Sequence, residues 1–185
     1  FGHRRTGCQD VEVLRAPEAG QAMRIVDLLG EFNPRGRGPV TAGLQTALET
    51  IPKGSAGTIL LVHDDLDNCQ QNPCSLTEGI RSQHPGVVIH VVSIAMSVAD
   101  ARQMQCLTTT TGGQHYLAAS GAQLVSAIAE VVDIVARSPG AAPAVAVRPE
   151  IGQRDTPAPT GPGLHLIASL GPTTLVPDLP VRWRA

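Results

Sequence analysis

The sequence predicts an α/β fold, with a doubly wound, mainly parallel sheet and helices on both of its faces. Residues 58–62 and 87–94 are continuous apolar runs with the length and composition of strands that are buried on both faces. Segments with apolar residues at helical spacing precede, separate and follow these two runs. Strands that alternate with helices imply right-handed crossovers and a parallel sheet.

The N-terminal part of the chain predicts an extended segment followed by two helices. In residues 10–14 polar and apolar side chains alternate, which is typical of a half-exposed edge strand or an extended segment. Apolar residues recur at helical spacing in residues 21–31, and the Pro- and Gly-rich residues 33–39 end that helix. Pro39 suits the first turn of a second helix, residues 39–51, which has one apolar face.

The remaining elements complete the alternation of strands and helices. We expect helices at residues 75–84, from residue 97 to the Thr- and Gly-rich residues 108–113, and at residues 120–137, with a short strand at residues 115–118. The starts of the last two helices have the spacing of capping boxes, namely Ser97 with Asp100 and Ser120 with Gln123. The predicted α/β domain therefore covers residues 1–137.

The C-terminal part of the chain has a different composition. Residues 138–162 are rich in Pro, Ala, Gly and Thr and predict a linker. Residues 163–170 and 179–184 alternate like antiparallel strands, and two strands do not make a stable domain. We therefore expect residues 163–185 to begin an Ig-like β-sandwich module. Because the chain opens on Phe1 rather than Met, we interpret it as a fragment truncated at both ends.

Composition narrows the classes of partner. The net charge is −2, Lys53 is the single lysine, and the arginines are scattered rather than clustered, which argues against binding of nucleic acid. No apolar stretch approaches the roughly 18 residues that span a bilayer, so we expect no membrane span in this segment.

Carboxylates crowd the end of the central strand. Asp64, Asp65 and Asp67 follow the apolar run directly, and ligands of open α/β sheets bind beyond the carboxyl ends of the strands. A metal ion or a reacting group is therefore expected at this edge. The alternative is structural, with Asp65 and Asp67 as solvated loop carboxylates and Asp67 bonded to the backbone in an Asx-turn.

The sequence does not predict an enzyme. His63 and Asp64 are neighbours on a strand, so their side chains point to opposite faces, and no Gly-x-Ser-x-Gly elbow supplies a nucleophile. His90 and His115 lie among apolar residues and are expected to be hydrogen-bonded core histidines.

Four motifs in order resemble bacterial von Willebrand factor A domains over residues 1–137. They are Phe1-Gly-His-Arg with Cys8 and Asp10-Val-Glu-Val-Leu, then Pro34-x-Gly36-x-x-Pro39, then Leu60-Leu-Val-x-Asp64-x-x-Asp67-Asn-Cys, and Thr111-Gly-Gly-x-x-Tyr116. The resemblance implies a doubly wound sheet whose first strand and helix precede this chain. That first strand lies centrally in the family, so its loss would leave unpaired backbone in the sheet.

The resemblance also implies a metal-ion-dependent adhesion site, in which Mg²⁺ takes oxygen ligands and keeps a position open for an acidic partner residue. The Asp of the fourth strand matches Asp64, while the Thr position matches Gly38, which has no side chain. The Asp-x-Ser-x-Ser loop would lie before Phe1. We therefore expect Mg²⁺ at most in the intact protein and none in this fragment, with a binding face at Gly36, Gly38, Asp64, Asp65 and Asp67.

The four cysteines allow disulfides, a zinc site or reduced thiols. The spacing of the cysteines and the dispersed histidines do not favour zinc. The family resemblance implies an exported protein and therefore disulfides, with Cys69–Cys74 closing a short loop and Cys8–Cys106 as the remaining pair. These disulfides would place the protein in the bacterial periplasm or outside the cell.

The expected function is that of an adhesion-type module that binds a protein partner at the carboxyl ends of the strands. One alternative is a phosphoacceptor receiver-like signalling domain, because the run of residues 59–65 superficially resembles the first strand and paired acids of a receiver. A receiver also needs a phosphoacceptor Asp on a later strand and a Lys near its last strand, which the sequence does not supply. A purely structural scaffold is the other alternative.

Overall fold

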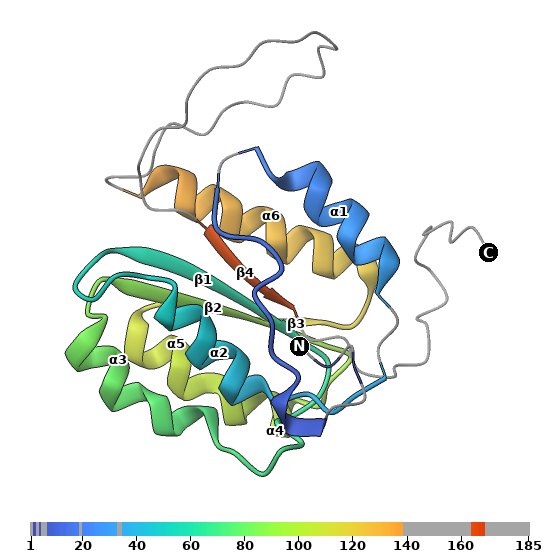
Figure 1. Cartoon of the computed structure of the whole chain (residues 1–185), viewed down its shortest axis with the longest axis horizontal. Coiled ribbons are helices and arrows are strands. Elements are labelled where there is room, and N and C mark those ends of the chain that lie inside the picture. The colour runs from blue at the N-terminus through green and yellow to red at the C-terminus, as the bar shows by residue number, and fades with distance from the viewer. Residues whose placement is uncertain are drawn as a thin grey trace, which may run out of the picture.

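Within the residues that the structure describes, the fold is built on a parallel sheet of four strands. The computed structural model describes residues 2, 4, 7–18, 20–32 and 35–138, together with the backbone of residues 164–168. The strands β1 (Gly57–His63), β2 (Val87–Ile94), β3 (His115–Ala118) and β4 (Leu164–Ala168) lie in the order β3-β2-β1-β4 (Figure 1). All three neighbouring pairs are parallel, as predicted for the two buried runs.

Helices cover both faces of this sheet, which confirms the predicted α/β arrangement. On one face α2 (Val40–Glu49), α3 (Thr77–Gln83) and α5 (Gln105–Thr111) share a core with Ile59, Leu61 and Ile89. On the other face α6 (Gly121–Arg137) packs on Leu60 and Val62 (Figure 1). Successive residues of β1 thus enter opposite cores, because side chains alternate along a strand.

The remaining helices of the described residues are short or lie outside the two cores. They are η1 (Gly7–Gln9), α1 (Ala22–Glu31), η2 (Pro73–Leu76), α4 (Val98–Ala101) and η3 (Arg102–Met104). The single helix expected after residue 97 is therefore divided into α4, η3 and α5. Residues 10–14 form no strand, so the extended-segment alternative holds there.

The helix boundaries follow local signals in the sequence. The side chains of Ser97 and Ser120 accept hydrogen bonds from the backbone N–H groups of Asp100 and Gln123, as the two capping patterns predict. Gly112 ends α5 in the left-handed conformation with φ of 75°, which a residue without a Cβ adopts at little cost.

The strand β4 differs from the expectation for the C-terminal segment. It pairs in parallel with β1, from Thr58 opposite Leu164 to Val62 opposite Ala168. We expected this stretch to pair antiparallel with residues 179–184, which lie outside the described residues, as do Phe1, Pro34, residues 139–163 and the rest of 169–185. Backbone pairing therefore continues beyond β1, at the edge that we expected to be unpaired. The division into domains remains a prediction.

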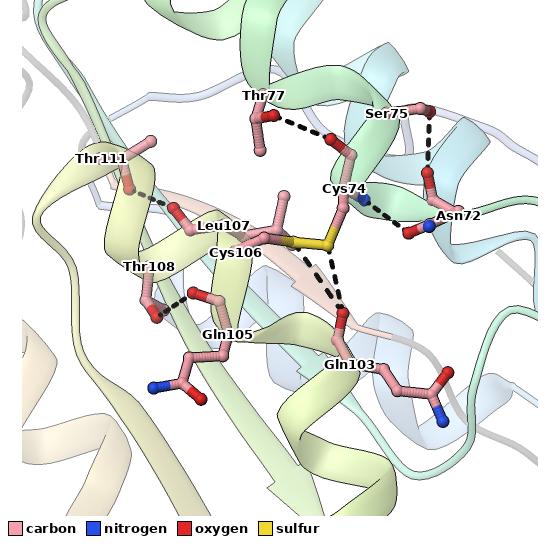
Figure 2. Close-up of a disulfide and its surroundings, with 10 residues drawn as sticks. All are labelled: Asn72, Cys74, Ser75, Thr77, Gln103, Gln105, Cys106, Leu107, Thr108 and Thr111. Carbon is pink, nitrogen blue, oxygen red and sulfur yellow. Dashed lines mark hydrogen bonds between the residues drawn. A yellow bond between two sulfur atoms is a disulfide. The ribbon is translucent and has the colours of Figure 1, made fainter.

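Both predicted disulfide pairings are wrong. The disulfides join Cys8 to Cys69 and Cys74 to Cys106, each with Cα atoms 5.6 Å apart. The short loop between Cys69 and Cys74 separates them, because Asn72 caps η2 and turns Cys74 toward α5. Figure 2 shows the Cys74–Cys106 disulfide beside the carbonyl group of Gln103 and close to the start of α5.

Candidate functional site

Two loops meet at the carboxyl ends of the strands, where the sequence places the candidate site. One loop, residues 64–69, follows β1, and the other, residues 35–39, leads into α2. The backbone N–H of Gly38 donates to Asn68 Oδ1 at 2.7 Å, and Arg37 Nη1 donates to the Asn68 carbonyl oxygen at 2.9 Å. The loops that carry the predicted binding face are therefore hydrogen-bonded to each other.

Asp67 holds this edge together. Its Oδ2 accepts from the Thr41 backbone N–H at 2.8 Å, and its Oδ1 accepts from Cys69 N–H at 2.8 Å and from Gln71 N–H at 3.4 Å. The bond to Cys69, two residues on, confirms the predicted Asx-turn. The N-cap residue of α2, Pro39, has no side-chain cap, so Asp67 supplies an acceptor for the first turn of that helix.

The other two carboxylates lie in different environments. Asp65 is exposed, with Oδ1 accepting from the Leu66 backbone N–H at 2.7 Å. Asp64 is half-buried, directly after the last residue of β1. At this edge Asp65 therefore offers negative charge to solvent, while Asp64 lies deeper.

The N-terminal segment is anchored to the same edge. The carboxylate of Asp10 is fully buried and accepts from Arg4 N at 2.5 Å and from Arg4 Nε at 2.7 Å, and the hydrogen bond to Asp10 raises the pKa of Arg4. The carbonyl oxygen of Gly2 accepts from the N–H groups of Arg35 and Gly36. A Cβ on Gly36 would collide with the Arg4 carbonyl oxygen, so this glycine is required by close packing of backbone.

The described residues do not make a complete magnesium site. At the positions matched by the resemblance, Asp64 supplies one carboxylate, and Gly38 supplies no side chain. Thr41 Oγ1 is a buried hydroxyl without a hydrogen-bond partner in the described part of the chain. One hydroxyl and one carboxylate nevertheless provide too few ligands for Mg²⁺, which takes six oxygen ligands. Among those residues no group of three or more His, Cys, Asp or Glu side chains could hold a metal ion.

Sequence reasoning missed a cluster of His63, Ser93 and His115 on adjacent strands. Ser93 Oγ lies 2.7 Å from His63 Nε2 and 2.9 Å from His115 Nε2, and His63 Nδ1 lies 2.9 Å from the Asp65 carbonyl oxygen. His63 and Ser93 are fully buried, so Ser93 is not an accessible nucleophile. The register places His63 opposite Ser93 and His115 opposite Val91, which a sequence without strand pairing does not reveal.

The histidines differ in their surroundings. Burial lowers the pKa of His63. Burial also lowers the pKa of His115, and the electrostatic effect of the neighbouring His63 lowers it further. Burial also lowers the pKa of His90, which is 2% exposed and accepts from the Gln114 backbone N–H at 3.1 Å. His90 is thus the hydrogen-bonded core histidine that we predicted, whereas His115 is half-buried and lines a pocket.

Comparison of the chain with protein-family models, curated proteins and solved structures found no match. The resemblance to von Willebrand factor A domains therefore remains a prediction. No helix within the described ranges combines the length and apolar character that crossing a membrane requires. The two disulfides are typical of proteins that fold in an oxidising compartment, outside the reducing cytosol.

Proposed function

We propose that this chain is a protein-binding module, similar in architecture to von Willebrand factor A domains, that recognises a partner through the loops at the carboxyl ends of its strands. The observation that supports this most is the fixed geometry of these loops. The Cys8–Cys69 disulfide, the hydrogen bonds of Asp67 and the contacts of Asn68 all act on residues 64–69.

A fixed loop surface favours binding because little conformational entropy is lost when a partner docks. The exposed side chains on the two loops include Arg37, Asp65 and Asn68, so the surface offers a cation, an anion and an amide. Such a polar surface suits a partner with complementary charges, which raises specificity and association rate more than affinity.

In this proposal the loops contact the partner directly. Mg²⁺ in the intact protein would need further oxygen ligands beside Asp64, because the Thr position is Gly38. The two disulfides support an exported protein, and we place it in the bacterial periplasm or outside the cell. No catalytic step is part of this function.

The test compares substitutions at opposite edges of the sheet. The wild-type chain, an Asp64→Ala/Asp65→Ala variant and a Lys53→Ala control are immobilised, and proteins of the exported fraction are quantified on each by mass spectrometry. Lys53 is exposed in the turn before β1, at the amino ends of the strands, and makes no contribution to the proposed face.

We expect at least one protein that the wild type and Lys53→Ala retain equally and that the double variant retains about fivefold less, which corresponds to the loss of about 1 kcal/mol. Circular dichroism should show the same fold for all three chains. Equal retention by the double variant and the control would exclude these carboxylates from the binding surface.

A further inference from the structure

We propose that a pocket beside β3, whose described lining includes no residue of the loops described above, binds a small α-hydroxy carboxylate with an aliphatic side chain. This β3 pocket has a volume of about 380 Å³, at the low end for small-ligand sites. It lies between the α4–α5 segment and β3, and the lining residues that carry the argument are Val98, Arg102, His115 and Leu117.

The cluster behind the pocket fixes the proton on His115. The Asp65 carbonyl oxygen only accepts hydrogen bonds, so His63 Nδ1 must carry a proton. A neutral His63 then has a bare Nε2, which accepts the one hydroxyl proton of Ser93. Ser93 Oγ can only accept from His115, so the proton of a neutral His115 lies on Nε2.

This direction leaves the other nitrogen of His115 as an acceptor. Nδ1 of His115 makes no hydrogen bond to the residues that the structure describes, and His115 is one of the residues that line the β3 pocket. Burial lowers the pKa of both histidines, which keeps them neutral near pH 7. His115 therefore offers a ligand one fixed acceptor and selects a hydrogen-bond donor such as a hydroxyl group.

The rest of the lining defines the ligand class. Arg102 is exposed and, within the described ranges, makes no ion pair and is the charged residue of the lining, so it suits a carboxylate. Among the residues that the structure describes, the lining contains no Asp or Glu, which disfavours an ammonium group and favours a hydroxyl as the donor to His115. Val98 and Leu117 are 55% and 47% exposed and offer apolar surface to an aliphatic group.

Three probes isolate the contribution of the hydroxyl donor. α-Hydroxyisocaproate carries the carboxylate, the hydroxyl and the aliphatic group, isocaproate lacks the hydroxyl, and α-methoxyisocaproate keeps the oxygen without its proton. Each is titrated into the full ¹⁵N-labelled chain, and binding is followed by NMR shifts of the pocket amides. The ¹⁵N shifts of the histidine rings report the tautomer of His115 in the same samples.

We expect saturable shifts confined to the pocket with α-hydroxyisocaproate, and affinities about three- to tenfold weaker for the two control acids, which is the range of one neutral hydrogen bond. The His115 ring should be protonated on Nε2 and bare on Nδ1. Equal affinities for the three acids, shifts outside the pocket, absence of binding, or a proton on Nδ1 would each overturn the proposal.

Variants test the two anchoring groups separately. Arg102→Gln should weaken binding of α-hydroxyisocaproate about fivefold, whereas Arg81→Gln, an exposed arginine on α3, should leave it unchanged. Ser93→Ala removes the group that fixes the tautomer, so discrimination between the hydroxy and methoxy acids should fall. Equal effects of the two arginine substitutions would overturn the carboxylate assignment, whether or not Ser93→Ala folds.

Discussion

Asp67 should be the residue of this edge on which stability depends most. Asp67→Ala removes two backbone-to-carboxylate hydrogen bonds of 2.8 Å, from Thr41 and Cys69, and a weak third of 3.4 Å from Gln71. Bonds to a charged acceptor contribute about 1.5 to 3 kcal/mol each, and the low end applies to a half-buried carboxylate. Thr41 is 4% exposed, so its N–H would be left without an acceptor.

We therefore expect Asp67→Ala to lower the free energy of unfolding by about 3 kcal/mol. Asp67→Asn keeps one acceptor oxygen and should lose about half of that. Asp65→Ala is the control, because this exposed carboxylate has a local bond to Leu66, and its effect should stay within about 0.5 kcal/mol.

The assay is urea unfolding followed by far-UV circular dichroism, with the disulfides kept oxidised. The dependence on urea, m, should be the same for all variants, so that differences in midpoint report stability. A loss below about 1 kcal/mol for Asp67→Ala would refute the assignment of Asp67 as the acceptor that holds α2 to the loop. An equal loss for Asp65→Ala would refute the distinction between the two carboxylates.

Three further predictions concern the whole fold. The double substitution Cys74→Ser/Cys106→Ser removes a disulfide with a sequence separation of 32 and should lower the free energy of unfolding in urea by about 3 to 4 kcal/mol. A Cys69–Cys74 disulfide in non-reducing peptide mapping would contradict this pairing. As the pH falls from 7.5 to 5, the free energy of unfolding should fall by up to about 1.4 kcal/mol per pH unit for each of His63, His90 and His115, because their pKa values are lowered in the folded state and the unfolded chain therefore binds more protons. A flat pH profile of the urea midpoint would refute this. Gly113→Ala should lower the free energy of unfolding by about 2 kcal/mol or more in the same assay, because the added Cβ would overlap the Ile89 carbonyl oxygen. The control Gly79→Ala, in open space on α3, should be neutral or stabilising.

The sequence by itself determined most of the elements between residues 21 and 137 and their faces, although it predicted α4, η3 and α5 as one helix. The apolar runs at β1 and β2, the capping serines of α4 and α6 and the turn at Asp67 are local signals, in which a residue and its neighbours decide the outcome. Parallel pairing of β1, β2 and β3 followed from the alternation of strands and helices, whereas the parallel pairing of β4 with β1 did not. The position of the carboxylates at the end of β1 could be predicted because they follow the apolar run directly in the sequence.

Only the tertiary structure decided which distant residues meet. Cys69 and Cys74 are close in sequence, yet each forms its disulfide with a residue brought near by folding, because a bond requires suitable Cα positions as well as a short loop. The contact of His63, Ser93 and His115 depends on the register of three strands, and a shift by one residue would turn a side chain to the other face. Strand register and disulfide pairing are set by packing of the whole domain, which local patterns do not encode.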